Sequence, residues 1–214
     1  VVTDGAGSGA AVTDVLDMTG GTGNVGLGSG SLGTAITTGT DNVAIGDSAM
    51  DAVTTGSDNV AVGDTAATAL TTGEGNVAIG SQAADATTTG NYNIAIGYDA
   101  LSANTTGSAS VAIGKEALKV STASNNTAVG RVALTANTTG NYNTAIGDGA
   151  LDANTTAANN TAVGHEALSV NTTGTQNVAV GSNALDANTT DSYQTAVGYN
   201  ALSASNGGGD NTAI

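Results

Sequence analysis

Residues 126–142 read NTAVGRVALTANTTGNY, and close variants of this stretch fill most of the 214-residue chain. The opening pentapeptide, usually Asn-(Val/Thr)-Ala-(Ile/Val)-Gly, recurs with little change. Eight of the ten intervals between its successive closing glycines are 17 residues, and the other two are 18 and 16 residues. A fixed short period of this kind indicates a repeat architecture. The closing glycines are Gly28, Gly46, Gly63, Gly80, Gly97, Gly114, Gly130, Gly147, Gly164, Gly181 and Gly198.

The positions after the glycine are constrained as well. Ala stands three residues after it in all ten full units, from Ala49 to Ala201, and Leu follows in seven of them. A polar residue, then Ala or Val, then usually Asn-Thr-Thr-Gly complete the unit. A unit of 17 residues is too short for a helix pair and suits one coil of a solenoid. The sequence therefore predicts an all-β protein, a parallel β-solenoid (β-roll) of about eleven coils.

Each unit predicts its own local elements. The pentapeptide predicts a strand in which Ala points one way and its two neighbours point the other way. The segment Ala-Leu-polar-Ala predicts a second strand, with a helical turn as the alternative because four residues are too few to define a period. Glycine and Asn-Thr-Thr-Gly predict the corners. Both unequal intervals can be placed in the variable stretch before the next pentapeptide, as expected for a surface turn.

The predicted pentapeptide strand is apolar on both faces. One face can line the interior of the coil, and the other needs a further cover. The sequence leaves open which face points inward. Because an exposed aliphatic ladder marks an interface, we expect a homo-oligomer, most simply three rods around a threefold axis. The predicted ladder consists of Ile45, Val62, Ile79, Ile96, Ile113, Val129, Ile146, Val163, Val180 and Val197.

Composition and charge argue against several functional classes. The chain has no Phe, Trp, Pro or Cys, so its interior must be thin and it offers no thiolate nucleophile or disulfide. Its only basic residues are Lys115, Lys119 and Arg131, and the formal charge is −15, which argues against binding to nucleic acid or to an anionic membrane. No apolar run approaches the roughly 18 residues of a membrane span. We expect neither enzymatic activity nor a cofactor.

The repeat resembles those of known fibre proteins. The unit NTAIGxxALxxNTTGxxN is similar to arrays in trimeric phage tail-fibre and tail-spike-like proteins and in bacterial surface fibres. It is also similar to the β-roll head of trimeric autotransporter adhesins, most closely at SVAIG, residues 110–114. The resemblance covers about residues 24–214 and implies a homotrimeric fibre. The unit is longer than the adhesin repeat, which leaves handedness and anchoring open.

The repeat divides the chain into two parts. Residues 1–23 lack the motif and are expected to form an N-terminal cap or connector, because an open solenoid end exposes unpaired backbone groups. Residues 24–214 form the predicted solenoid. The chain opens without an initiator Met and stops inside a motif, so we expect it to be a piece of a longer protein.

Isolated residue types suggest few sites. His165 is the only histidine, and the matching position in other units holds Asp148, Ser182 or Tyr199, so we interpret it as a solvated side chain. The aspartates are scattered and lack the GGxGxD motif of calcium-binding β-rolls, so we assign them to solubility rather than to a metal. Those that share one register are Asp51, Asp85, Asp152 and Asp186.

Two patterns in the corner segment allow alternative interpretations. The Asn-Thr-Thr triplets match the N-glycosylation acceptor pattern, but their regular register favours hydrogen-bonded ladders. They begin at Asn104, Asn137, Asn154, Asn171 and Asn188. A threonine column could order water as ice-binding solenoids do, although adjacent threonines should point alternately inward and outward. That column contains Thr54, Thr71, Thr88, Thr105 and Thr138.

The five tyrosines fall into two registers. Tyr92, Tyr142 and Tyr193 precede the pentapeptide, whereas Tyr98 and Tyr199 follow its glycine. Tyrosine is common at glycan and protein contacts, but five such residues do not define a site from the sequence.

The sequence thus predicts a structural shaft or head segment of a fibre outside the cell, on the cell surface or on a virion. Such a tail-fibre or adhesin segment would space or present a receptor-binding surface. The alternatives are a subunit of a self-assembling extracellular filament and an ice- or surface-binding solenoid. The expected partner is the chain itself, and a host-cell glycan or a surface receptor is a further candidate.

Overall fold

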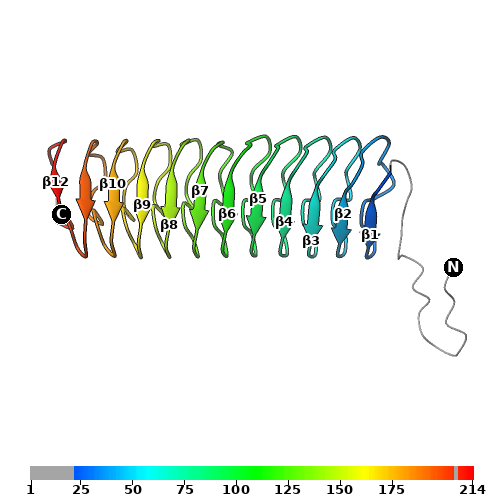
Figure 1. Ribbon diagram of the computed structural model, residues 1–214, viewed down its shortest axis with the longest axis horizontal. Helices are drawn as coiled ribbons and strands as arrows, with labels where there is room; N and C mark the ends of the chain where they lie inside the picture. The colour runs from blue at the N-terminus through cyan, green and yellow to red at the C-terminus, as the bar shows by residue number, and fades with distance from the viewer. Residues whose placement is uncertain (1–21, 205–206) are drawn as a thin grey trace, which may run out of the picture.

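The computed structural model describes residues 22–204 and 207–214, which form one long parallel β-solenoid (Figure 1). This part of the chain contains twelve strands, and the predicted all-β solenoid of about eleven coils is confirmed. The predicted cap, residues 1–23, lies outside the described residues except for Thr22 and Gly23. The strands are β1 (Val25–Leu27), β2 (Val43–Ile45), β3 (Val60–Val62), β4 (Val77–Ile79), β5 (Ile94–Ile96), β6 (Val111–Ile113), β7 (Thr127–Val129), β8 (Thr144–Ile146), β9 (Thr161–Val163), β10 (Val178–Val180), β11 (Thr195–Val197) and β12 (Thr212–Ala213).

All strands belong to one sheet, and each pairs in parallel with the next along the chain, from β1 to β12. Equivalent positions of neighbouring coils lie side by side; Ala61, for example, pairs with Ala78. Figure 1 shows the result as a straight row of strands. With about 4.8 Å between neighbouring strands, β1 to β11 extend over about 48 Å.

The middle residue of each three-residue strand, β1 to β11, faces the interior. The sequence had left open which face of the strand points inward. In β5, Ala95 is fully buried, whereas Ile94 and Ile96 remain partly exposed. The interior is narrow. In the first coil, where the middle residue is Gly26, an added Cβ would lie 3.1 Å from Cδ1 of Leu32. A small side chain at this position therefore leaves room for the leucine of the same coil.

The prediction of a second strand is wrong. The segment that carries Ala and Leu forms consecutive turns in every coil, and β1 to β12 are the only strands of the described residues. Ala100 and Leu101 are adjacent and both fully buried, which an extended strand could not achieve because its side chains alternate between faces. Leu101 instead takes a left-handed conformation with φ of 56°. Its side chain thus joins that of Ala100 in the core.

Leucines of this segment supply the largest side chains of the core. Their fully buried members are Leu32, Leu101, Leu118, Leu134, Leu151, Leu168 and Leu185. The turns are also hydrogen-bonded from coil to coil, since the Leu101 N–H donates to the carbonyl oxygen of Ala117 at 2.9 Å. Backbone hydrogen bonds and the leucine column therefore hold the same coils together.

Both unequal intervals lie outside the strands, as predicted. The extra residue of the 18-residue interval, however, lies in the turn segment between Leu32 and Thr37, and not in the stretch before the next pentapeptide where the sequence placed it. The 18-residue interval leaves the pairing of β1 with β2 intact, and the 16-residue interval leaves the pairing of β6 with β7 intact. Surface turns absorb an extra or a missing residue because a slip inside a strand would turn its buried alanine outward.

Candidate functional site

The outer strand face consists of the outward side chains of the first and third residues of β1 to β11. The predicted ladder, from Ile45 to Val197, forms its third-residue column together with Leu27 of β1. None of these ten side chains is buried in the single chain. The exposed fraction is 38% for Ile45 and 41% for Ile146. The structure therefore brings the predicted ladder together as a continuous aliphatic stripe on the outside of the rod.

The first-residue column changes along the rod. It is Val or Ile from β1 to β6 and in β10, but it is Thr in the other four strands of this face, β7, β8, β9 and β11. The threonines are Thr127, Thr144, Thr161 and Thr195. The N-terminal half of the outer strand face is thus aliphatic in both columns, and most of the C-terminal half combines threonine with an aliphatic column.

An internal asparagine ladder runs beside the sheet, and sequence reasoning did not assign it a role. Nδ2 of Asn160 donates to the carbonyl oxygen of Gly174 at 2.8 Å. Its Oδ1 accepts the backbone N–H of Asn177, in the next coil, at 2.9 Å. Ten of the twelve pentapeptides, complete or truncated, begin with Asn, and this recurrence was the available signal. The exceptions, Ser110 and Gln194, also carry polar side chains and are buried.

The Asn-Thr-Thr triplets form a second ladder, so the hydrogen-bonding interpretation is confirmed. Nδ2 of Asn154 donates to Oδ1 of Asn137 at 2.9 Å and to the carbonyl oxygen of Ala157 at 3.1 Å. All five triplet asparagines are at most 1% exposed. A glycan on these nitrogens is incompatible with the folded coil, because each nitrogen is enclosed and engaged.

The threonine column at the corner is engaged within the protein. The hydroxyl of Thr71 donates to the carbonyl oxygen of Thr88 at 3.0 Å, and that of Thr88 donates to Thr105 in the same way. The second threonine of each pair, such as Thr72 or Thr89, is exposed. The first column therefore links successive coils, and its hydroxyl protons are directed along the rod.

The three basic residues gather in the coils that begin with β6 and β7. Nζ of Lys119 lies 2.9 Å from Oδ2 of Asp99, and the hydrogen bond from Lys119 to this carboxylate raises the lysine pKa. Nη2 of Arg131 lies 3.0 Å from Oδ2 of Asp148. Lys115 lies 3.6 Å from Oε1 of Glu116. Exposed ion pairs add little to stability, so this cluster mainly neutralises one part of an acidic rod.

Two aspartates in the turn segment have altered acidity. Burial raises the pKa of both Asp85 and Asp152. Oδ1 of Asp85 is buried without a hydrogen-bond partner, which explains why the charged form is disfavoured there. Among the described residues, no three His, Asp or Glu side chains form a group that could hold a metal ion.

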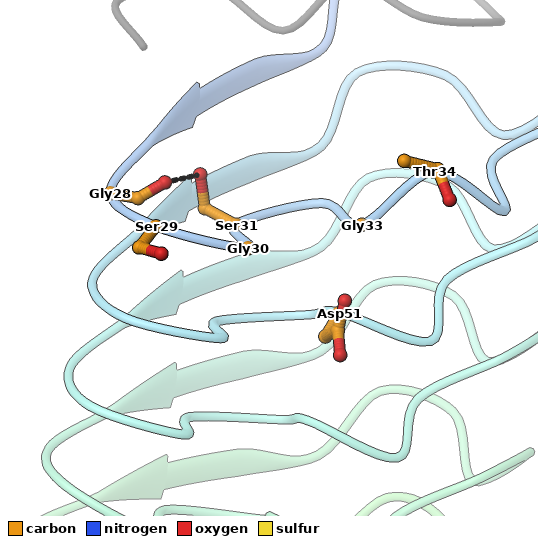
Figure 2. Close-up of a pocket in the computed structure, with 7 residues that line it drawn as sticks. All are labelled: Gly28, Ser29, Gly30, Ser31, Gly33, Thr34 and Asp51. Atoms are coloured by element: carbon orange, nitrogen blue, oxygen red, sulfur yellow. Dashed lines mark hydrogen bonds between the residues drawn. The ribbon is translucent and has the colours of Figure 1, made fainter.

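Two hollows on the surface of the rod have both polar and apolar groups in their lining. The hollow in Figure 2 is lined by backbone and small side chains of the first coil together with Asp51 of the second. In it, the hydroxyl of Ser31 donates to the carbonyl oxygen of Gly28 at 3.1 Å. A second hollow contains Asp152 and His165. His165 is exposed, as predicted, and its Nδ1 lies 3.9 Å from Oε2 of Glu166.

Comparison with protein-family models, with curated proteins and with solved structures gives no match to this chain. No helix in the described part of the chain is long and apolar enough to cross a membrane.

Proposed function

We propose that this chain is a structural segment of a homotrimeric fibre, a rod that spaces or presents a receptor-binding surface outside the cell or on a virion. The observation that carries this proposal is the aliphatic stripe on the outer strand face, continuous from β1 to β11. Inter-coil hydrogen bonds along the whole rod support a mechanical role, because each coil is held by its neighbours. The sequence resemblance to trimeric fibre repeats points to the same assembly.

The size of the stripe supports self-association. A length of about 48 Å and a width of roughly 10 Å correspond to about 500 Å² of largely apolar surface. That is at the upper end of what a monomer exposes, and it approaches the roughly 800 Å² that each partner contributes to a stable interface. In a threefold arrangement each rod touches two neighbours, so the flanks of the stripe would add to the buried area.

The assembly can be tested by measuring mass in solution. Light scattering should give three times the chain mass of 20.2 kDa, independent of concentration above the dissociation range. A folded monomer would refute the assembly, and a mass that keeps growing with concentration would indicate an open-ended filament instead.

A pair of variants tests which surface is used. Ile96→Asp places a charge on the outer strand face, so it should yield a monomer that keeps its β-sheet circular dichroism. Asp152→Asn lies in the turn segment and should leave the trimer mass unchanged. Trimers that persist with Ile96→Asp would exclude this face as the interface.

A further inference from the structure

Three tyrosines line one edge of the rod. Tyr92, Tyr142 and Tyr193 lie two residues before β5, β8 and β11, and they share one backbone conformation, with φ of 56°, 59° and 62°. Their exposed fractions are 61%, 63% and 57%. Because equivalent positions stack from coil to coil, the three side chains form one column. Neighbours in this column are three coils apart, about 14 Å.

Contacts with the preceding coil hold the ring of Tyr92 in place. The hydroxyl of Tyr92 donates to the carboxylate of Glu74 in the preceding coil. The ring also lies across Gly75, where an added Cβ would come within 2.6 Å of its Cδ1. Glycine at this position makes room for the ring. An aromatic side chain that is already ordered loses little entropy when a ligand covers it.

A polar side chain precedes each tyrosine and is anchored to the previous coil. Oδ1 of Asn91 accepts the N–H of Glu74 at 2.8 Å, and Oδ1 of Asn141 accepts that of Ser124 at 2.9 Å. Oγ of Ser192 accepts the N–H of Thr175 at 2.9 Å. Each tyrosine therefore stands next to a fixed amide or hydroxyl group, and the rod repeats this pair at equal intervals.

We propose that the tyrosine column binds an extended, neutral polysaccharide. An exposed ring offers a flat apolar surface for the C–H face of a sugar, and the neighbouring amide or hydroxyl group can hydrogen-bond its hydroxyls. Equal spacing suits a polymer that repeats along its own length. A folded protein partner would instead need a contiguous, well-packed contact area with a desolvated centre, and rings about 14 Å apart do not provide one.

The charge of the rod decides between classes of polysaccharide. A formal charge of −15 repels polyanions, so the surface favours a neutral chain. Each ring alone binds weakly, and the affinity comes from linkage of the three contacts. An oligosaccharide that reaches from Tyr92 to Tyr193, about 29 Å, should bind much more tightly than one that reaches a single ring.

This inference extends the proposed function, because it makes the rod itself an adhesive surface, and it is tested on the assembled protein. Native gels containing a soluble β-glucan, a galactomannan, an arabinoxylan or anionic alginate serve as probes. We expect at least one neutral polymer to retard the protein, with alginate having no effect. Tyr142→Ala should weaken the retardation by about tenfold, and replacing all three column tyrosines by Ala should abolish it. Tyr98→Ala and Tyr199→Ala, which alter exposed rings of the other register, should change it less than about twofold.

The failures of the two proposals can be told apart. Retardation by none of the neutral polymers would overturn the polysaccharide proposal. Equal retardation by alginate, or an unchanged triple variant, would overturn it as well. Light scattering and circular dichroism on each variant report assembly and folding independently. A monomer that still binds would refute only the trimer.

Discussion

Gly147, the glycine that follows β8, is the residue whose replacement by Ala should be most informative about how coils stack. Its φ of 142° lies in a region that residues with a side chain rarely adopt. An added Cβ would lie 2.2 Å from the carbonyl oxygen of Gly164 in the next coil and 2.5 Å from its carbonyl carbon. Both atoms belong to the backbone, so no side-chain rotation can relieve the contact.

The expected cost has two parts. The backbone conformation alone costs a residue with a Cβ about 1–3 kcal/mol. Restoring ordinary contact requires the two coils to separate locally by about 1 Å, which stretches hydrogen bonds such as that from Gly164 N–H to Ile146 at 2.8 Å beyond their useful range. Losing two such bonds costs about 2 kcal/mol. Gly147→Ala should therefore destabilise the protein by about 3–5 kcal/mol.

Gly149→Ala is the matched control. Gly149 also has a positive φ, of 66°, but an added Cβ would meet only Cγ of Glu166, at an ordinary 3.5 Å. Other coils place Ser48 or Thr65 at the equivalent position with φ of 53° and 54°, so a side chain is tolerated there, and the cost should be about 1 kcal/mol. Urea unfolding followed by circular dichroism at one fixed protein concentration measures both. Equal destabilisation by the two variants would refute the stacking argument.

Three further predictions concern the core, the asparagine ladder and a buried carboxylate. Leu151→Ala should lower the unfolding free energy by about 2–4 kcal/mol in urea, because it empties a fully buried site. Asn160→Ala should cost about 2–4 kcal/mol in the same assay, because it leaves the Gly174 carbonyl and the Asn177 N–H unpaired. Burial raises the pKa of Asp85, so the folded state holds the proton more tightly and stability falls as pH rises from the ordinary pKa of 3.8 through the raised value. Asp85→Asn should therefore have a higher melting temperature than the parent protein at pH 7 and the same melting temperature below pH 3.8. A parent protein with the higher melting temperature at pH 7 would contradict this prediction.

The strand assignments show where the sequence pattern is strong. The central alanine with aliphatic neighbours has the alternation of a strand, and the structure places strands at each of these sites. The prediction of a second strand in the Ala-Leu segment was wrong because sequence patterns assume a right-handed or an extended backbone. Leu134 and its equivalents adopt φ of about 50°. This left-handed conformation is unfavourable for an isolated leucine, and packing inside the closed coil offsets its cost.

The candidate sites divide in a similar way. The aliphatic ladder and the tyrosine registers were visible in the sequence, because a fixed period places equivalent residues in columns. The pairing of Tyr92 with Glu74 and Gly75 was not, since these groups come together only when one coil lies on the next. The asparagine ladder escaped notice for the same reason, because a recurring polar residue can be either a surface residue or a buried donor until its partners are known.

The 17-residue period, read from the printed residues alone, determined the architecture: coils of equal length stack in register, and their apolar positions must form columns. Only the tertiary structure decided which of these columns face the interior of the coil. That choice depends on the width of the closed coil, which admits the methyl of Ala95 and the side chain of Leu101 but leaves Ile96 outside. Packing volume is a property of the folded coil, and no local preference of a single residue encodes it.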